Sequence, residues 1–381
     1  MRNRLVLKAL IIFMLVFSGC EFESYEDWEM PPYDGIFSWS EINPDAAWSQ
    51  RYDHAGAVFN DKMWIFGGYD QGRMKGDTYL EDIWSSEDGE SWALETENAP
   101  WKGRRGHSVN VFNDGTGEAL YLIGGFEVDE ATKYRQYTND VWKSSDGVNW
   151  IQVKERTDSY ADTTISDWNP RFNHSCLRVN FDGKDYLYII GGSAMRENYS
   201  GLYSFKYYND IWRSKDGITW EEVPSEDFGE RSELAAFFDG ETGRLYVHGG
   251  VHGKLLESEN NYHHPVANYE AVWYTDDGLN WQVDTSLIIG RAGHDIFKYR
   301  GYLWMFPGSN NSYKKFHMAW GNTHYTYRKG KVGEWELDSE GSAFNGRHSY
   351  VRLNFKDKVY VMGGETGDMG PDNDIWVGTI N

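Results

Sequence analysis

Short apolar runs recur along the chain after Gly35 and are separated by longer polar segments. Each run holds three or four residues, is rich in aromatic and β-branched side chains, and most runs end at a Gly-Gly pair. The runs are Met63–Phe66, Tyr121–Ile123, Leu187–Ile190, Leu245–His248, Leu303–Phe306 and Val359–Met362. Runs of this length and composition predict β-strands rather than helices.

These strands belong to a repeat. Gly-Gly pairs follow five of the runs, and Pro307-Gly308 takes the place of the remaining pair. Two further elements follow in most units: an Asp-x-Trp strand at Asp82, Asp140, Asp210 and Asp374, with Ala271 in the Asp position of one unit, and an Asp-Gly-x-x-Trp turn at Asp88, Asp146, Asp216 and Asp277. Asp-Gly favours hairpin turns because glycine accepts a positive φ. Six units of four strands predict an all-β fold, a six-bladed β-propeller of four-stranded antiparallel blades over residues 36–381.

The last unit ends at Asn381, directly after its third strand. The segment Phe37–Ile42 has the tryptophan-bearing pattern of a fourth strand. We therefore expect the N-terminal strand to complete the last blade, which closes the ring and leaves no unpaired strand edge there.

The order Gly-Gly, Asp-x-Trp and Trp in units of this length is similar to Kelch and galactose-oxidase propellers. The Asp-Gly-x-x-Trp turns also resemble the Asp-boxes of sialidase propellers, although they are one residue shorter, and Asp-boxes are structural turns. A copper site of the galactose-oxidase type would need a Tyr–Cys cross-link, for which only Cys176 in a predicted first strand remains. The acid and nucleophile of a sialidase are not visible in the sequence.

Residues 1–19 have the features of a secretory signal: Arg2, Arg4 and Lys8 precede the apolar run from Ala9 to Phe17. Ser18-Gly19-Cys20 resembles the lipobox of bacterial lipoproteins, which implies a lipid on Cys20, an acidic tether over residues 20–35 and an envelope protein held at the outer membrane by the lipid anchor alone. An ordinary signal peptide with an incidental cysteine is the alternative.

The formal net charge of the chain is −22, and the predicted signal carries three of its cations. A surface this acidic repels polyanions at long range, so we do not expect a nucleic-acid partner. An acidic ligand would require cations gathered at one place. We expect a monomer.

Strand direction brings one set of long loops and the start of every first strand to the same face of a propeller. The starts carry Arg-x-x-His clusters at Arg51 and His54, Arg104 and His107, Arg171 and His174, and Arg291 and His294, with departures at Arg231 and at Arg347-His348. We interpret them as a cationic funnel that binds carboxylate or sulfate. The alternative is that these residues make structural hydrogen bonds between blades and bind no ligand.

The funnel, the tyrosine-rich loops and the envelope location together resemble propeller-type polysaccharide lyases that act on ulvan, and related dehydratases of uronate oligosaccharides. The resemblance implies β-elimination on an anionic poly- or oligosaccharide, without a required cofactor. From their positions we assign His107 and His174 to the base or neutralising group and Tyr203 to proton transfer. Arg171 is assigned to the carboxylate of the substrate. Further substrate-binding candidates are Arg51, His54, Arg104, Arg231, Arg291, His294, Arg347 and His348.

Two other functions fit the same sequence. Kelch-like propellers include sialic acid mutarotases, which also use a central cationic pocket, and they include propellers that only bind glycans or proteins. A separate histidine cluster is a candidate for a structural zinc ion, because clustered imidazoles bind zinc. Its members are His248, His252, His263 and His264.

Overall fold

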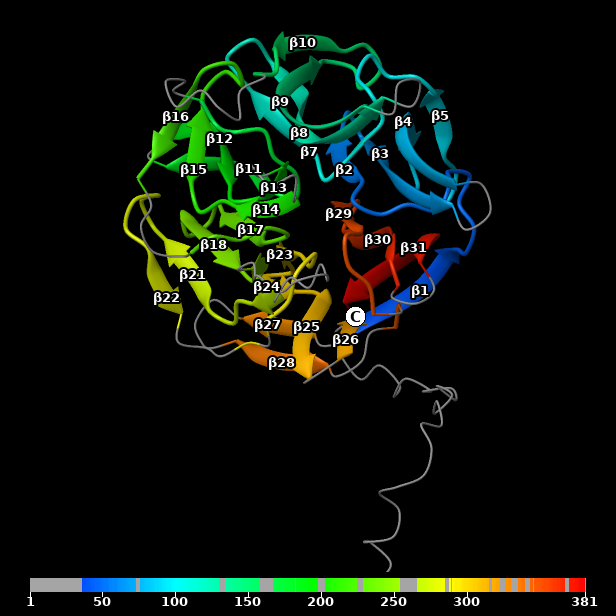
Figure 1. Cartoon of the computed structure of the whole chain (residues 1–381). Helices are drawn as coiled ribbons and strands as arrows, with labels where there is room; N and C mark the ends of the chain where they lie inside the picture. The colour runs from blue at the N-terminus through cyan, green and yellow to red at the C-terminus, as the bar shows by residue number, and fades with distance from the viewer. Residues whose placement is uncertain are drawn as a thin grey trace, which may run out of the picture. The chain divides into compact units, whose positions relative to one another are not determined.

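The computed structural model describes residues 36–72, 76–129, 134–157, 167–181, 183–197, 203–224, 229–253, 266–284, 288, 290–314, 317–322, 326–329, 335–339, 343–344, 346–366 and 370–380. These residues form β-strands and connecting turns. Six sheets surround one axis, as Figure 1 shows. The predicted six-bladed β-propeller is confirmed. Within the described ranges, no helix is long and apolar enough to cross a membrane. The predicted signal, Cys20 and the tether lie outside the described residues.

The first three blades follow the predicted order of strands. Blade one consists of β2 (Ala55–Phe59), β3 (Lys62–Gly72), β4 (Gly76–Ser86) and β5 (Ala93–Thr96). Blade two consists of β7 (Ser108–Asn113), β8 (Glu118–Asp129), β9 (Tyr134–Ser144) and β10 (Ile151–Lys154), with β6 (Arg104–Arg105) also paired to β8. Blade three consists of β11 (Ser175–Phe181), β12 (Lys184–Ile190), β15 (Ile211–Ser214) and β16 (Trp220–Val223).

The other three blades complete the ring. Blade four consists of β17 (Ala235–Asp239), β18 (Arg244–His248), β21 (Val272–Thr275) and β22 (Gln282–Asp284). Blade five consists of β23 (Ile296–Tyr299), β24 (Tyr302–Met305), β27 (Thr326–Lys329) and β28 (Glu336–Ser339). Blade six consists of β29 (Val351–Phe355), β30 (Lys358–Glu365), β31 (Pro371–Ile380) and β1 (Phe37–Asn43).

The N-terminal strand closes the ring, as the sequence predicted. Strand β1 pairs antiparallel with β31, from Phe37 opposite Ile380 to Asn43 opposite Ile375. The Phe37 side chain is 2% exposed and packs against Trp304 of blade five at a ring distance of 4.6 Å. Blade six is therefore held by both ends of the propeller chain.

The core lies between the blades. Among the described residues, six large clusters of buried apolar side chains each join two neighbouring blades. Strand β3 shows the reason: Trp64 and Phe66 face blade two, whereas Met63 and Ile65 face blade six. Alternate residues of a strand point to opposite faces, so a strand buried on both faces carries apolar residues at every position.

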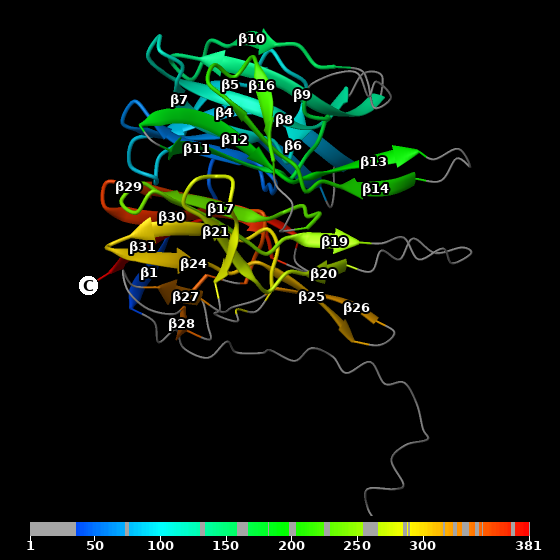
Figure 2. The same cartoon turned by 90° about the vertical axis from the view of Figure 1, so that its left-hand side faces the viewer.

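Paired strand extensions project from one face of the propeller. Three of them are separate hairpins in blades three, four and five: β13 (Ser193–Glu197) with β14 (Tyr203–Tyr207), β19 (Val251–Gly253) with β20 (Val266–Asn268), and β25 (Ser309–Lys314) with β26 (His317–Asn322). Figure 2 shows all three on the same side of the molecule. We call this side the loop face. It is the face on which the sequence placed the long loops.

Candidate functional site

The arginine of each first-strand cluster is completely buried. Arg51 is representative: its Nη1 donates to the Gly67 carbonyl at 2.9 Å, and its guanidinium bonds both carboxylate oxygens of Asp82 at 2.7 and 2.8 Å. The Trp84 indole donates to the same carboxylate at 2.7 Å. The same arrangement joins Arg104 with Asp140 and Trp142, Arg171 with Asp210 and Trp212, and Arg347 with Asp374 and Trp376. The Asp-x-Trp motif therefore holds the arginine of its own blade.

Blades four and five lack the aspartate and place an aromatic ring beside the guanidinium. Arg231 lies over the Tyr269 ring at 4.0 Å, and Arg291 lies over the Tyr327 ring at 5.1 Å. Burial lowers the pKa of both arginines to about 10. Both guanidinium groups also donate to a backbone carbonyl just after the second strand of their own blade, Gly249 for Arg231 and Phe306 for Arg291.

This geometry agrees with the structural alternative for the six arginines. Four of the six positive charges are compensated within their own blades, and all six side chains lie below the surface. The assignment of Arg171 and its counterparts to substrate binding stays a prediction, and the positions of these side chains give it no support.

The four cluster histidines are also buried. His54, His107, His174 and His294 are each less than 9% exposed. Burial and then the neighbouring arginine lower the pKa of His107 and of His174 to about 3, so both imidazoles are neutral at physiological pH. His294 accepts or donates a hydrogen bond with His248 at 2.9 Å, and His174 bonds Ser108 Oγ at 3.2 Å. The roles of His107 and His174 in catalysis stay predictions.

A closed ring of backbone hydrogen bonds surrounds the propeller axis. One residue between the arginine and the histidine position of each blade donates its N–H to the carbonyl of its counterpart in a neighbouring blade, at 2.8 to 3.0 Å. The members of this axial ring are Asp53, Gly106, Asn173, Glu233, Gly293 and Ser349. All have φ between 51° and 61°, the left-handed region. A cavity of about 150 Å³ is lined by the axial ring and the four cluster histidines.

The residue that precedes each ring member lies on the loop-face side. There it forms an antiparallel β-bridge with the residue directly after the Gly-Gly pair, or after Pro-Gly in blade five, as Tyr52 does with Tyr69. These residues differ from blade to blade: Tyr52, Arg105, Phe172, Ser232, Ala292 and His348. We define the mouth cluster as seven residues near the axis on this side: Tyr52, Asp53, Arg105, Phe172, Glu233, His348 and Glu365. It draws on five of the six blades.

Arg105 occupies the centre of the mouth cluster. Its guanidinium carbon lies 4.9 Å from the Tyr69 ring and about 6 Å from the rings of Tyr52, Tyr79 and Phe172. Its Nη1 donates to the Tyr52 hydroxyl at 3.0 Å and lies 3.7 Å from an Asp53 carboxylate oxygen. The side chain is 23% exposed, and its Nε has no hydrogen-bond partner among the described residues. Arg105 is thus a partly exposed cation that aromatic rings hold in place.

Two carboxyl groups with unusual protonation lie near Arg105. Burial, and next the charge of Asp53, raise the pKa of Glu233 to about 7 and that of Glu365 to about 7. The Asn173 amide donates to Glu233 at 3.4 Å, and His348 Nε2 lies 3.6 Å from a Glu365 oxygen. Glu365 also raises the pKa of Glu233. Near neutral pH each of these two carboxyl groups is therefore present in both its protonated and its ionised form.

Some sequence candidates are only partly described. Tyr203 begins β14 opposite Glu197, but its side chain lies outside the described residues. His252 lies 4.5 Å from the Tyr269 ring, and His263 and His264 lie outside the described residues. No group of three or more histidine, cysteine, aspartate or glutamate side chains within the described ranges could hold a metal ion. The zinc site stays a prediction.

Of the candidates chosen from sequence, only His348 lies in the mouth cluster. Sequence reasoning missed Arg105, Glu233 and Glu365. A usable signal was present, because the two positions between arginine and histidine vary from unit to unit while the flanking positions repeat.

Comparison with known proteins supports the fold. No family model matches the chain. It is 27% identical to the Kelch domain-containing protein 3 of Rattus norvegicus over 177 residues, which is 45% of this chain and 40% of that protein. It is 26% identical to the Acyl-CoA-binding domain-containing protein 4 of Arabidopsis thaliana over 245 residues, 61% of this chain and 31% of that protein. The chain therefore spans less than half the length of these curated relatives.

A solved structure of YjhT covers 88% of this chain, with 96% of that chain aligned, a TM-score of 0.61 and 15% identity. At this identity the likeness shows the fold alone. The resemblance to Kelch-type propellers that the repeat predicted is confirmed by the curated relatives, by this structure and by the six blades.

Proposed function

We propose that the mouth cluster binds a single acidic sugar and interconverts its anomers, as sialic acid mutarotases do. The observation that carries the proposal is the position of one partly exposed arginine, Arg105, beside two carboxyl groups, Glu233 and Glu365, whose pKa values are both about 7.

Arg105 supplies the recognition of the acid. A guanidinium forms paired hydrogen bonds with a carboxylate, and it is a stronger partner when surrounding groups hold it in place. Tyr52, Tyr69 and Phe172 surround it on several sides. Aromatic rings of this kind also stack against the C–H faces of a sugar ring.

Glu233 and Glu365 supply the proton transfer. Opening of the sugar ring removes a proton from the anomeric hydroxyl, breaks the bond between the anomeric carbon and the ring oxygen, and adds a proton to that oxygen. Closure on the other face reverses these steps and yields the other anomer with no net change in protons. An acid and a base with pKa values near the working pH are the most effective for this purpose.

The backbone of Glu233 is a second reason to assign it this role. Its φ is +57°, a region that asparagine and aspartate tolerate better than glutamate. Asn173 and Asp53 stand at the equivalent positions of other blades. Strained conformations concentrate at functional sites, where the side chain is needed despite its backbone preference.

The test is exchange between anomers, measured by nuclear magnetic resonance on N-acetylneuraminic acid. The soluble domain is expected to accelerate exchange, and Arg105→Gln is expected to weaken sugar binding by about 100-fold, the loss of one charge-assisted bidentate contact. Glu222→Gln changes an exposed carboxyl on the outer strand β16 and serves as the control. Binding without accelerated exchange would favour a glycan-binding propeller.

Uronate β-elimination is a second candidate, favoured by the same Arg105, which could neutralise a uronate carboxylate. The assignment of its base or neutralising group to His107 and His174 stays a prediction. New ultraviolet absorbance from an unsaturated product, on incubation with ulvan, would support it in place of anomer exchange. Export to the envelope through Cys20 also stays a prediction, because residues 1–35 lie outside the described part of the chain.

A further inference from the structure

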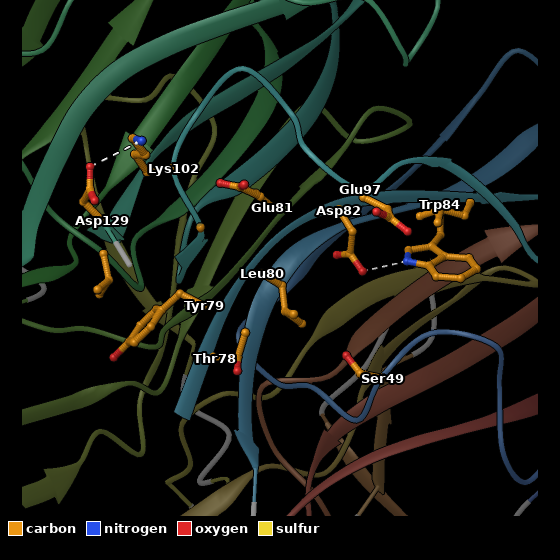
Figure 3. A pocket seen from close by; sticks show the side chains of 13 residues that line it. Ser49, Thr78, Tyr79, Leu80, Glu81, Asp82, Trp84, Glu97, Lys102 and Asp129 are labelled. Atoms are coloured by element: carbon orange, nitrogen blue, oxygen red, sulfur yellow. Dashed lines mark hydrogen bonds and ion pairs between the residues drawn. The ribbon is translucent and has the colours of Figure 1, made fainter. Parts of the chain in front are cut away.

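A second cavity lies between blades one and two, outside the mouth cluster. Its volume is about 540 Å³, within the range of small-molecule sites. Strand β4 and the connection that leads into β6 form its walls, together with the end of β8. Figure 3 shows Tyr79, Lys102 and Asp129 at one end and Trp84, Glu97 and Ser49 at the other. We call it the blade cleft.

Apolar side chains form part of the lining of the blade cleft. Tyr79, Leu80, Trp84 and Val128 line it, and Leu94 adds a side chain that is 41% exposed. Tyr79 also lies 6.0 Å from the guanidinium carbon of Arg105. The Tyr79 side chain therefore belongs to the walls of both the blade cleft and the mouth cluster.

The carboxylates of the blade cleft are mostly compensated. Asp82 is held by Arg51 and by the Trp84 indole, and Asp129 lies 3.3 Å from Lys102. Burial raises the pKa of Glu81, opposed by Lys102 and by a bond from the Gly103 N–H. What these groups offer to a ligand is a set of oxygen acceptors with a modest net negative charge.

We propose that the blade cleft binds an uncharged sugar unit. Sugar hydroxyls are donors that suit carboxylate acceptors, and the C–H face of a sugar ring packs against aromatic and aliphatic side chains such as Trp84 and Leu80. A second acidic sugar is excluded, because Glu81 and Glu97 add negative charge beside it. The proposal does not depend on the reaction assigned to the mouth cluster.

The experiment is saturation-transfer magnetic resonance with glucose, galactose, N-acetylglucosamine and lactose on the folded domain. At least one of these sugars is expected to receive saturation from the protein. Leu94→Trp fills the blade cleft. It is expected to lower the affinity for that sugar by about tenfold or more, because most of the buried contact surface is lost. Leu337→Trp is the matched control, since Leu337 has the equivalent place on the outer strand of blade five and is 45% exposed.

Arg105→Gln separates the two sites. It is expected to weaken binding of N-acetylneuraminic acid by about 100-fold. The neutral sugar is expected to change much less, because Arg105 does not line the blade cleft and meets its wall only at Tyr79. The proposal is overturned if none of the four sugars binds, or if Leu94→Trp and Leu337→Trp weaken binding equally. It is also overturned if glucosamine or spermidine binds instead with a steep salt dependence, which would make the blade cleft a cation site.

Discussion

Two adjacent residues of blade two use the same side chain in opposite ways. Arg104 is 1% exposed and bonds Asp140, Glu127 and the Gly124 carbonyl. Arg105 is partly exposed. One of its nitrogens, Nη1, donates a hydrogen bond to the Tyr52 hydroxyl and lies 3.7 Å from an Asp53 carboxylate oxygen. The first arginine is saturated by its own blade, whereas the second has fewer partners and is partly accessible from the solvent.

Repetition distinguishes the two residues. An arginine equivalent to Arg104 is present in all six blades, because every blade has the same need to fix its strand turn. The position of Arg105 is occupied by a different residue in each blade. In a propeller, a position that repeats serves the architecture shared by all blades, whereas a position that varies is available for a ligand that meets the ring only once.

The largest expected effect is on stability, for Arg104→Met. Removal of Arg104 leaves the buried Asp140 without its cationic partner, although Glu127 keeps Arg156. Loss of one partner of a buried ion pair costs about 3–5 kcal/mol of unfolding free energy. Arg105→Gln is expected to cost less, since its side chain is 23% exposed and its ion pair with Asp53 is longer, at 3.7 Å. Urea unfolding of both variants measures the difference. Equal losses of unfolding free energy in the two variants would contradict the distinction between a structural Arg104 and a ligand-accessible Arg105.

The next effect is on activity, for Glu233→Gln. Loss of one proton-transfer group is expected to slow anomer exchange by about 100-fold. For the unchanged protein, the rate is expected to be highest near pH 7, because exchange needs one of the two carboxyl groups protonated and the other ionised. The rate of Glu233→Gln should lack that maximum. A maximum that persists would assign the pH dependence to other groups.

Much of the fold could be predicted from the sequence because its determinants are local and repeated. Gly-Gly marks the strand turn, Asp-x-Trp marks the third strand, and Phe37–Ile42 has the pattern of the missing fourth strand. Each signal would be weak alone, but the regular spacing of six units leaves few other ways to bury the apolar strands.

The site could not be predicted in the same way, because side-chain direction near the axis depends on one backbone angle. Asn173 or Asp53 can be extended or left-handed, and the sequence does not say which. In the structure all six ring members are left-handed and bond one another around the axis, while the arginine of each blade is buried. In blade six His348 lies at the mouth. Tyr350 takes the position that histidine has in blades one, two, three and five.

The buried histidines are expected to make the unfolding free energy depend on pH, with a smaller change per pH unit than the effects above. The pKa values of His107 and His174 fall from 6.5 to about 3 on folding, so the unfolded chain binds more protons between these values. Stability is therefore complete above pH 6.5 and falls as the pH drops toward 3, by up to about 1.4 kcal/mol per pH unit for each imidazole. Urea midpoints at pH 7, 5.5 and 4.5 measure the slope.

His107→Gln sharpens this test, since it removes one of the buried imidazoles that titrate on unfolding. The slope of stability against pH should decrease in this variant. An unchanged slope would mean that carboxyl groups, and not the buried imidazoles, determine the acid sensitivity of the propeller.

The smallest expected effect separates stability from function at a single position. Glu233→Asn gives the axial ring a residue that accepts a left-handed φ, as Asn173 does in blade three, so we expect unfolding free energy to rise by about 1 kcal/mol. Anomer exchange should nevertheless be lost, because the carboxyl is gone. The matched control is Lys356→Asn, which relieves a φ of 46° in a turn of blade six that joins β29 to β30, where Asn60 stands at the equivalent place in blade one. That variant should gain stability and keep its activity. If Glu233→Asn were instead less stable than the unchanged protein, the Glu233 backbone would not be strained, and its carboxyl would contribute to the architecture like the repeated arginines.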